Sequence, residues 1–163
     1  MGTLSCEKGV FSDLSTIQRA GPAIMSKVVL RGDILLSLHV STKLTLMELK
    51  FESCDLTILD YPPKTVQPKI TVGTNGIALV LSVSGQSSSC TSKVQKSSIT
   101  IFSDVVVATG TEPPNVMTDV FLSGLIQGNQ VEITASIQKA IYNSLGKALN
   151  DAKLCEYFQE YLG

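Results

Sequence analysis

The sequence predicts an α+β fold, in which a curved antiparallel β-sheet of about six strands packs on a long C-terminal amphipathic helix, plus a short N-terminal helix. Between residues 27 and 127, apolar and polar side chains alternate with the period of two that half-buried strands show. From residue 131 onward, isoleucine and leucine recur at every fourth position, which is typical of a helix with one apolar face. No change of composition marks a second domain, so the sequence predicts a single domain, 1–163.

The N-terminal segment, residues 1–26, is expected to hold the short helix. Phe11, Leu14 and Ile17 fit one helical face, and Gly21-Pro22 would end such a helix. This segment is predicted to act as a clasp on the core.

The sheet is expected to occupy residues 27–127. Its strands are predicted at residues 28–40, 44–59, 69–74, 77–84, 97–109 and 116–127. In the second strand, the apolar positions change from odd to even numbers between Phe51 and Cys54, without a turn residue. This change predicts a β-bulge near Ser53, which would bend the sheet.

Turn residues predict the connections between these strands. Asn75-Gly76 favours a type I′ hairpin in which Val72 faces Leu79, because both residues tolerate positive φ angles. The serine-rich segment 85–96 is expected to form a loop, and Pro113-Pro114 to lie in the turn before the last strand.

The C-terminal helix is predicted over residues 131–162. Its apolar stripe is expected to be buried against the sheet and consists of Ile133, Ile137, Ile141, Leu145 and Leu149. Gly146 and Asn150-Asp151 weaken the helix, so a kink or break is expected there.

Charge and hydropathy limit the partners. The 13 Lys and Arg residues nearly balance the 14 Asp and Glu residues, which argues against nucleic acid as a partner. Only 17% of the residues are charged, so apolar surface is left over for an internal cavity, an interface between copies of the chain, or a membrane surface.

Catalytic signatures are missing from the sequence, so we expect a protein that is not an enzyme and needs neither cofactor nor metal. His39 is the single histidine, and a phosphate-binding loop, a nucleophile elbow and a dinucleotide fingerprint are all absent. Catalysis by carboxylates alone remains an alternative because several acidic residues lie close in sequence: Glu48, Glu52, Asp55 and Asp60.

The four cysteines show no metal-site spacing, so the leading interpretation is free or buried thiols, although two disulfides are possible in principle. No secretory signal follows Met1. The protein is therefore expected to be cytoplasmic or membrane-peripheral, or extracellular if the chain is a mature fragment.

Two short motifs suggest alternative roles. Gly2 approximates an N-myristoylation site, and Cys6 would then supply a second, palmitoylated anchor. Arg31-Gly32-Asp33 spells a tripeptide that integrins read, but it is expected to lead directly into a strand and not to lie at a loop tip.

Several segments resemble the bactericidal/permeability-increasing family, the tubular lipid-binding (TULIP) proteins. The similar residues are Pro62-Pro63, the run PKITVGTNGIALVLSVS at 68–84, the segment FSDLSTIQRAG at 11–21, and Leu122-Ser123-Gly124-Leu125 before the long helix. The resemblance implies a curved sheet around a helix, with acyl chains in the groove between them. The chain lacks the basic tip of lipopolysaccharide binders, which argues against that ligand.

The sequence therefore predicts a non-catalytic protein that binds or transfers lipids or other apolar ligands between sheet and helix. The residues expected to line the groove are Leu79, Leu81, Val83, Ile101, Ile137, Ile141, Leu145 and Leu149. The alternative is a structural or assembly protein, such as a viral matrix-type or membrane-peripheral adaptor that self-associates into a homo-oligomer.

Overall fold

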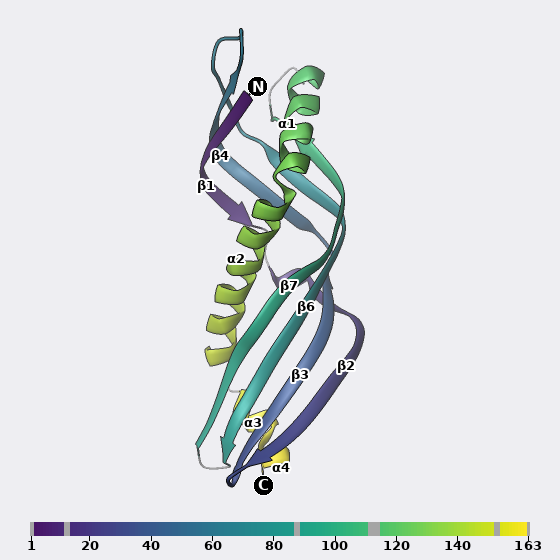
Figure 1. Ribbon diagram of the computed structural model, residues 1–163, viewed down its shortest axis with the longest axis vertical. Coiled ribbons are helices and arrows are strands. Elements are labelled where there is room, and N and C mark those ends of the chain that lie inside the picture. Colours follow the sequence, from purple (N-terminus) through teal and green to yellow (C-terminus); the bar gives the residue numbers. More distant parts are fainter. Residues whose placement is uncertain (1, 12–13, 87–88, 111–114, 152–153, 163) are drawn as a thin grey trace. The chain divides into compact units, whose positions relative to one another are not determined.

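The computed structural model describes residues 2–11, 14–86, 89–110, 115–151 and 154–162 (Figure 1). The strands are β1 (Gly2–Phe11), β2 (Ile17–Leu30), β3 (Asp33–Leu44), β4 (Met47–Ile58), β5 (Lys64–Val66), β6 (Lys69–Gln86) and β7 (Ser89–Ala108). The helices are η1 (Leu14–Thr16, a 3-10 turn), α1 (Val116–Gly128), α2 (Gln130–Asp151), α3 (Leu154–Tyr157) and α4 (Gln159–Leu162). The predicted α+β class with a large antiparallel sheet is confirmed.

Hydrogen bonds connect the strands in the order β1-β4-β6-β3-β2, with β5 on β4 and β7 on β6. The described residues thus form a sheet of seven strands, and the expected number of about six is wrong. Strands β2, β3, β6 and β7 run side by side in Figure 1.

The chain folds as two compact units, and each is built from separated segments. Unit 1 comprises residues 1–16, 44–75 and 102–135, and unit 2 comprises residues 17–43, 76–101 and 136–163. Strands β6 and β7 and helix α2 contribute residues to both units. The assignment of a single domain, 1–163, stays a prediction.

Unit 1 has a core between helix α1 and the strands. Leu122 and Ile126, one helical turn apart, are buried on the face of α1 that meets the sheet. The strand residues buried in the same cluster are Cys54, Leu56, Val66, Ile70 and Val107. The Asn115 side chain caps α1 by accepting a hydrogen bond from the Thr118 N–H group, at 3.1 Å.

Among the described residues, unit 2 has a hydrophobic cluster that is smaller than the core of unit 1. Leu36 of β3 and Val83 of β6 are cross-strand partners and are both buried. Cys155 and Phe158, from α3 and the residue after it, pack against them. Helix α2 is joined to β7 by two hydrogen bonds of Gln138, one from the Ser97 hydroxyl and one from the Ile99 N–H group.

The prediction for the N-terminal segment was wrong. Residues 2–11 form strand β1, which pairs with β4 from Gly2↔Ile58 to Phe11↔Leu49. The expected helix is reduced to the turn η1, and Gly21-Pro22 lies inside strand β2. Since β2 is an edge strand, proline is tolerated there, because it need not donate to a second neighbour.

The hairpin predicted at Asn75-Gly76 was also wrong, since β6 continues through it. The Asn75 side-chain amide is buried and makes two hydrogen bonds to the backbone of Leu44, at 2.8 and 2.9 Å. A Cβ atom at Gly76 would lie 2.7 Å from the Thr100 Oγ1 atom. Gly76 therefore allows β6 and β7 to approach closely. The Asn75 side chain makes the hydrogen bonds to Leu44 that a backbone group of a paired strand would otherwise make.

The strand predicted at 116–127 is helix α1, and the loop predicted at 85–96 is largely strand, since β7 begins at Ser89. Pro113-Pro114 and Ser87-Ser88 lie outside the described residues. The single helix expected over 131–162 is divided into α2, α3 and α4, and α2 ends at Asp151, where the break was expected.

The β-bulge predicted near Ser53 agrees with the strand register. Strand β4 pairs with β6 up to Lys50↔Lys69 and with β5 from Cys54↔Val66. Residues 51–53 of β4 therefore lie opposite only residues 67 and 68, so β4 has one extra residue.

Both pairs of cysteines form disulfides, and the interpretation as free or buried thiols was wrong. Cys6 pairs with Cys54 across β1 and β4 in unit 1, and Cys90 pairs with Cys155 in unit 2. The antiparallel register of β1 and β4 places Cys6 opposite Cys54. The spacing of the cysteines in the sequence does not reveal this pairing.

Candidate functional site

Unit 1 contains a cavity of about 480 Å³ beside the junction of helices α1 and α2. We call it the helix-junction cavity. It is lined by Gly2, Thr3, Leu4, Cys6, Phe51, Pro68, Ile70, Leu125, Ile126, Asn129, Glu132 and Ile133. Its volume lies within the range of about 300–1,000 Å³ that is usual for small-molecule pockets.

The helix-junction cavity lies beside Asn129, the residue between α1 and α2. The Asn129 N–H group and side-chain amide both donate to the Leu125 carbonyl, at 3.1 and 2.7 Å, and so close the end of α1. The walls come from aliphatic and aromatic side chains of α1, β4 and β6, while Asn129 and Glu132 are the polar groups at the helix junction. Such a lining suits an apolar molecule with a small polar end.

A second cavity in unit 1, of about 360 Å³, lies between the β4–β5 turn and the first turn of α1. We call it the hairpin cavity. Its lining residues are Leu56, Ile58, Tyr61, Pro62, Lys64, Asn115, Met117, Thr118 and Phe121. Tyr61 and Met117 are largely exposed, so these two side chains lie at the opening of the cavity.

Gly2 lies against Phe121, which lines the hairpin cavity. A Cβ atom at Gly2 would clash with the Phe121 ring and would approach the Thr57 carbonyl oxygen at 2.9 Å. Gly2 and Cys6 both belong to strand β1, which is paired with β4. Palmitoylation of Cys6 is excluded in this structure because its sulfur is in a disulfide, whereas acylation of Gly2 stays a prediction.

The residues predicted to line the ligand groove are placed differently. Neither of the two cavities is lined by any of the eight. Ile137 and Ile141 are buried, and Leu145 and Leu149 are half-buried, in agreement with an inward stripe on α2. Leu79 and Val83 are buried, Leu81 is half-buried, and Ile101 is exposed.

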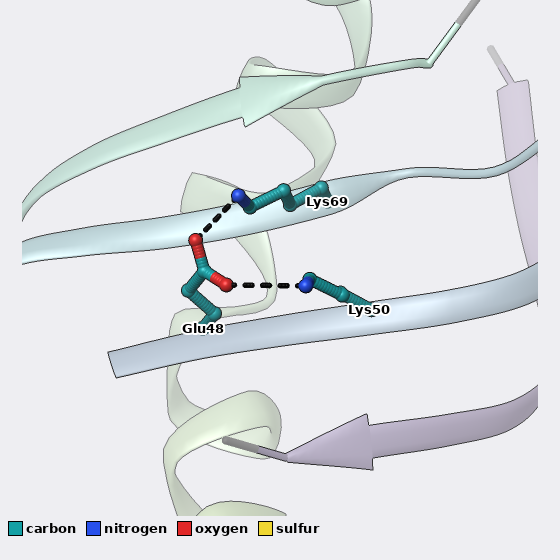
Figure 2. Close-up of polar contacts among 3 residues, drawn as sticks. All are labelled: Glu48, Lys50 and Lys69. Atoms are coloured by element: carbon teal, nitrogen blue, oxygen red, sulfur yellow. Dashed lines mark ion pairs between the residues drawn. The ribbon is translucent and has the colours of Figure 1, made fainter. Parts of the chain in front are cut away.

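Three of the four acidic residues proposed as a catalytic alternative have separate polar partners, and the fourth, Asp60, has a positive φ angle of 69° in the turn after β4. The Glu48 carboxylate makes ion pairs with Lys50 and Lys69, as Figure 2 shows. Glu52 pairs with Lys8, and Asp55 accepts a hydrogen bond from the Thr65 hydroxyl. The hydrogen bond from Lys69 holds the pKa of Glu48 below its ordinary value of 4.5, with further lowering by the charges of both lysines. An ionised carboxylate held in this way is a poor general acid.

Replacing Glu48 with glutamine should lower the free energy of unfolding at pH 7. Because folding lowers the pKa of Glu48, its stabilising contribution is present above pH 4.5, the ordinary pKa, and is lost as the pH falls below it. Urea unfolding at pH 7 and pH 3 should show a difference between wild type and variant that shrinks at pH 3. A matched control is Glu52→Gln, since Lys8 and Glu52 are both highly exposed and should contribute little. A difference of equal size at both pH values would contradict the assignment.

Other sequence motifs occupy surface positions. His39 is exposed on β3, opposite Val80. Arg31 and Gly32 form the exposed turn between β2 and β3, with φ angles of 52° and 89°. The expectation that these residues lie away from a loop tip was therefore wrong, although Asp33 leads directly into β3 as expected. Integrin recognition, which the sequence disfavours, stays untested.

No group of three or more His, Cys, Asp or Glu side chains within the described segments is arranged to hold a metal ion. No described helix combines the length and apolar character needed to cross a bilayer.

Comparison with models of protein families gives no match to this chain, and comparison with curated proteins gives none. The function is therefore inferred from the lining residues and volumes of the two cavities.

Proposed function

We propose that unit 1 binds a lipid or another apolar small molecule in the helix-junction cavity, and that the protein carries this ligand without chemically changing it. The observation that supports the proposal best is the cavity of about 480 Å³ between α1, the start of α2 and strands β1, β4 and β6. Burial of an acyl chain against Phe51, Ile70 and Ile133 would be driven by the hydrophobic effect, at roughly 25 cal/mol per Å² of apolar surface.

The resemblance to the TULIP proteins supports the same class of ligand, because it implies acyl chains between a sheet and a helix. The same resemblance implies a strongly curved sheet wrapped on one long helix, and we include this architecture in the proposal. Two disulfides favour an oxidising compartment, so we place the carrier outside the cytoplasm.

Self-association is the second candidate function, and edge strand β2 favours it. Ile24, Val28 and Leu30 of this strand are 63%, 51% and 69% exposed, and an exposed apolar edge is a template for pairing with another copy of the chain. Native mass spectrometry separates the two functions: a monomer with bound lipid supports the carrier, and oligomers without ligand support a matrix-type or adaptor protein.

Filling the helix-junction cavity should weaken apolar binding. Ile133 is half-buried and lines the cavity, so Ile133→Trp should place an indole ring in the space that the ligand uses. We expect the affinity for N-phenyl-1-naphthylamine, an uncharged fluorescent probe, to fall by roughly tenfold, or about 1.4 kcal/mol. Fluorescence titration measures this directly.

The matched control is Ile133→Val, which keeps the cavity open and should bind the probe with nearly unchanged affinity. Circular dichroism should show that both variants keep the fold of the wild type. Equal probe affinity in wild type and Ile133→Trp, or no saturable binding to the wild type, would contradict the proposed function.

A further inference from the structure

The hairpin cavity has an apolar interior and a polar side with a net positive character. Leu56 and Phe121 line it from β4 and α1. Leu56 is buried and Phe121 packs against the core, so these side chains form a fixed wall. Lys64 of β5 is the only charged residue among those lining the cavity within the described segments. No described carboxylate lies within ion-pair distance of its ammonium group.

The first turn of α1 contributes to the same polar side. Thr118 and Asp119 donate their N–H groups to Asn115, so these two donors are satisfied. The N–H groups of Val116 and Met117 precede them and have no partner inside the helix. The helix dipole adds positive potential at this end. The acidic residue of this turn, Asp119, is already engaged, since it accepts the Thr109 N–H group at 3.0 Å.

We infer that the hairpin cavity binds the carboxylate of a long-chain carboxylic acid, with the hydrocarbon chain against Leu56 and Phe121. Lys64 and the N–H group of Met117, both of which line the cavity, hold the carboxylate by charge-assisted hydrogen bonds. The volume of about 360 Å³ lies near the lower end for ligand pockets, which favours one chain over the two chains of a phospholipid. This inference rests on the proposed function, since it names a ligand class for unit 1.

Decanoate and 1-decanol test the inference because they have equal chains and differ in the charged group. By isothermal titration at pH 7.5, the wild type should bind decanoate about tenfold more tightly than 1-decanol. Lys64→Gln should abolish this preference and leave 1-decanol binding unchanged, whereas Lys64→Arg should retain it. The control Lys93→Gln removes the same charge from an exposed position of β7 in unit 2 and should change neither affinity.

Amide NMR tests the helix donor separately, because the Met117 N–H group lies at the cavity wall and has no partner inside the helix. In ¹⁵N spectra of the wild type, the Met117 amide proton should move downfield with decanoate but not with 1-decanol.

The outcomes separate this inference from the proposed function. The headgroup preference should persist in Ile133→Trp, because that change fills only the helix-junction cavity. Equal affinities of the wild type for decanoate and 1-decanol, or equal losses in Lys64→Gln and Lys93→Gln, would overturn the carboxylate site and leave apolar binding intact. Failure of both compounds and of the uncharged probe would overturn both proposals.

Discussion

Replacing both Cys6 and Cys54 with alanine is expected to lower the free energy of unfolding by about 2–5 kcal/mol. The bond joins β1 to β4 across 48 positions of sequence, so its loss enlarges the unfolded ensemble. Cys54 is only 1% exposed and belongs to the core of unit 1, so alanine also removes packing there. Urea unfolding followed by circular dichroism measures the change.

The corresponding control is the double replacement of Cys90 and Cys155 in unit 2. This pair is separated by 65 positions, so its loss should also destabilise the protein. Binding of N-phenyl-1-naphthylamine should nevertheless survive under folding conditions, because the helix-junction cavity belongs to unit 1 and is lined by Cys6. An unfolding midpoint of the Cys6/Cys54 variant equal to that of the wild type would contradict the importance of this disulfide.

Ile141→Ala is expected to cost about 2–5 kcal/mol in unfolding free energy. The side chain is fully buried on α2, so truncation removes apolar burial and leaves a cavity in a packed region. The matched variant is Leu149→Ala on the same helical stripe. Leu149 is half-buried, so its truncation should cost clearly less. Equal losses at both positions would show that burial does not set the stability of this helix.

The sequence predicted strands well where the alternation of apolar and polar residues was regular. Strands β3 and β4 follow the alternating pattern, and the parity change at Ser53 coincides with an extra residue in β4. Asn75-Gly76 misled because local turn propensity was overridden by the pairing of β6 with β4 at residues 69–72 and with β3 at residues 77–85. This pairing joins residues that are far apart in the sequence, so no local motif predicts it.

Helix α1 could have been found from the sequence. Thr118, Leu122 and Ile126 recur at every fourth position, Asn115 is a capping residue and Asp119 is an acid in the first turn. These signals were missed because apolar residues on both sides of this short segment also fit a strand. The two short helices after α2 do show this spacing, since Leu154, Phe158 and Leu162 recur at every fourth position, and the sequence predicted helix there.

An apolar binding site between strands and a helix stays a prediction, but the residues predicted to line it do not line either cavity. The cavities are lined by β1, β4, β6, α1 and α2 in one case and by β4, β5 and α1 in the other. The difference follows from the missed strand β1, whose residues Gly2, Leu4 and Cys6 close one side of the helix-junction cavity. The pairing of Cys6 with Cys54 could not be predicted from the sequence either, because it depends on the register of β1 and β4.

Binding of an apolar molecule inside unit 1 should be visible in a methyl-labelled NMR titration with 1-decanol. We expect saturable shifts of the Leu125, Ile126 and Ile133 methyl groups, which line the helix-junction cavity. Shifts that never saturate, or that affect only exposed side chains such as Val28 and Leu30 on β2, would show that 1-decanol does not bind inside unit 1.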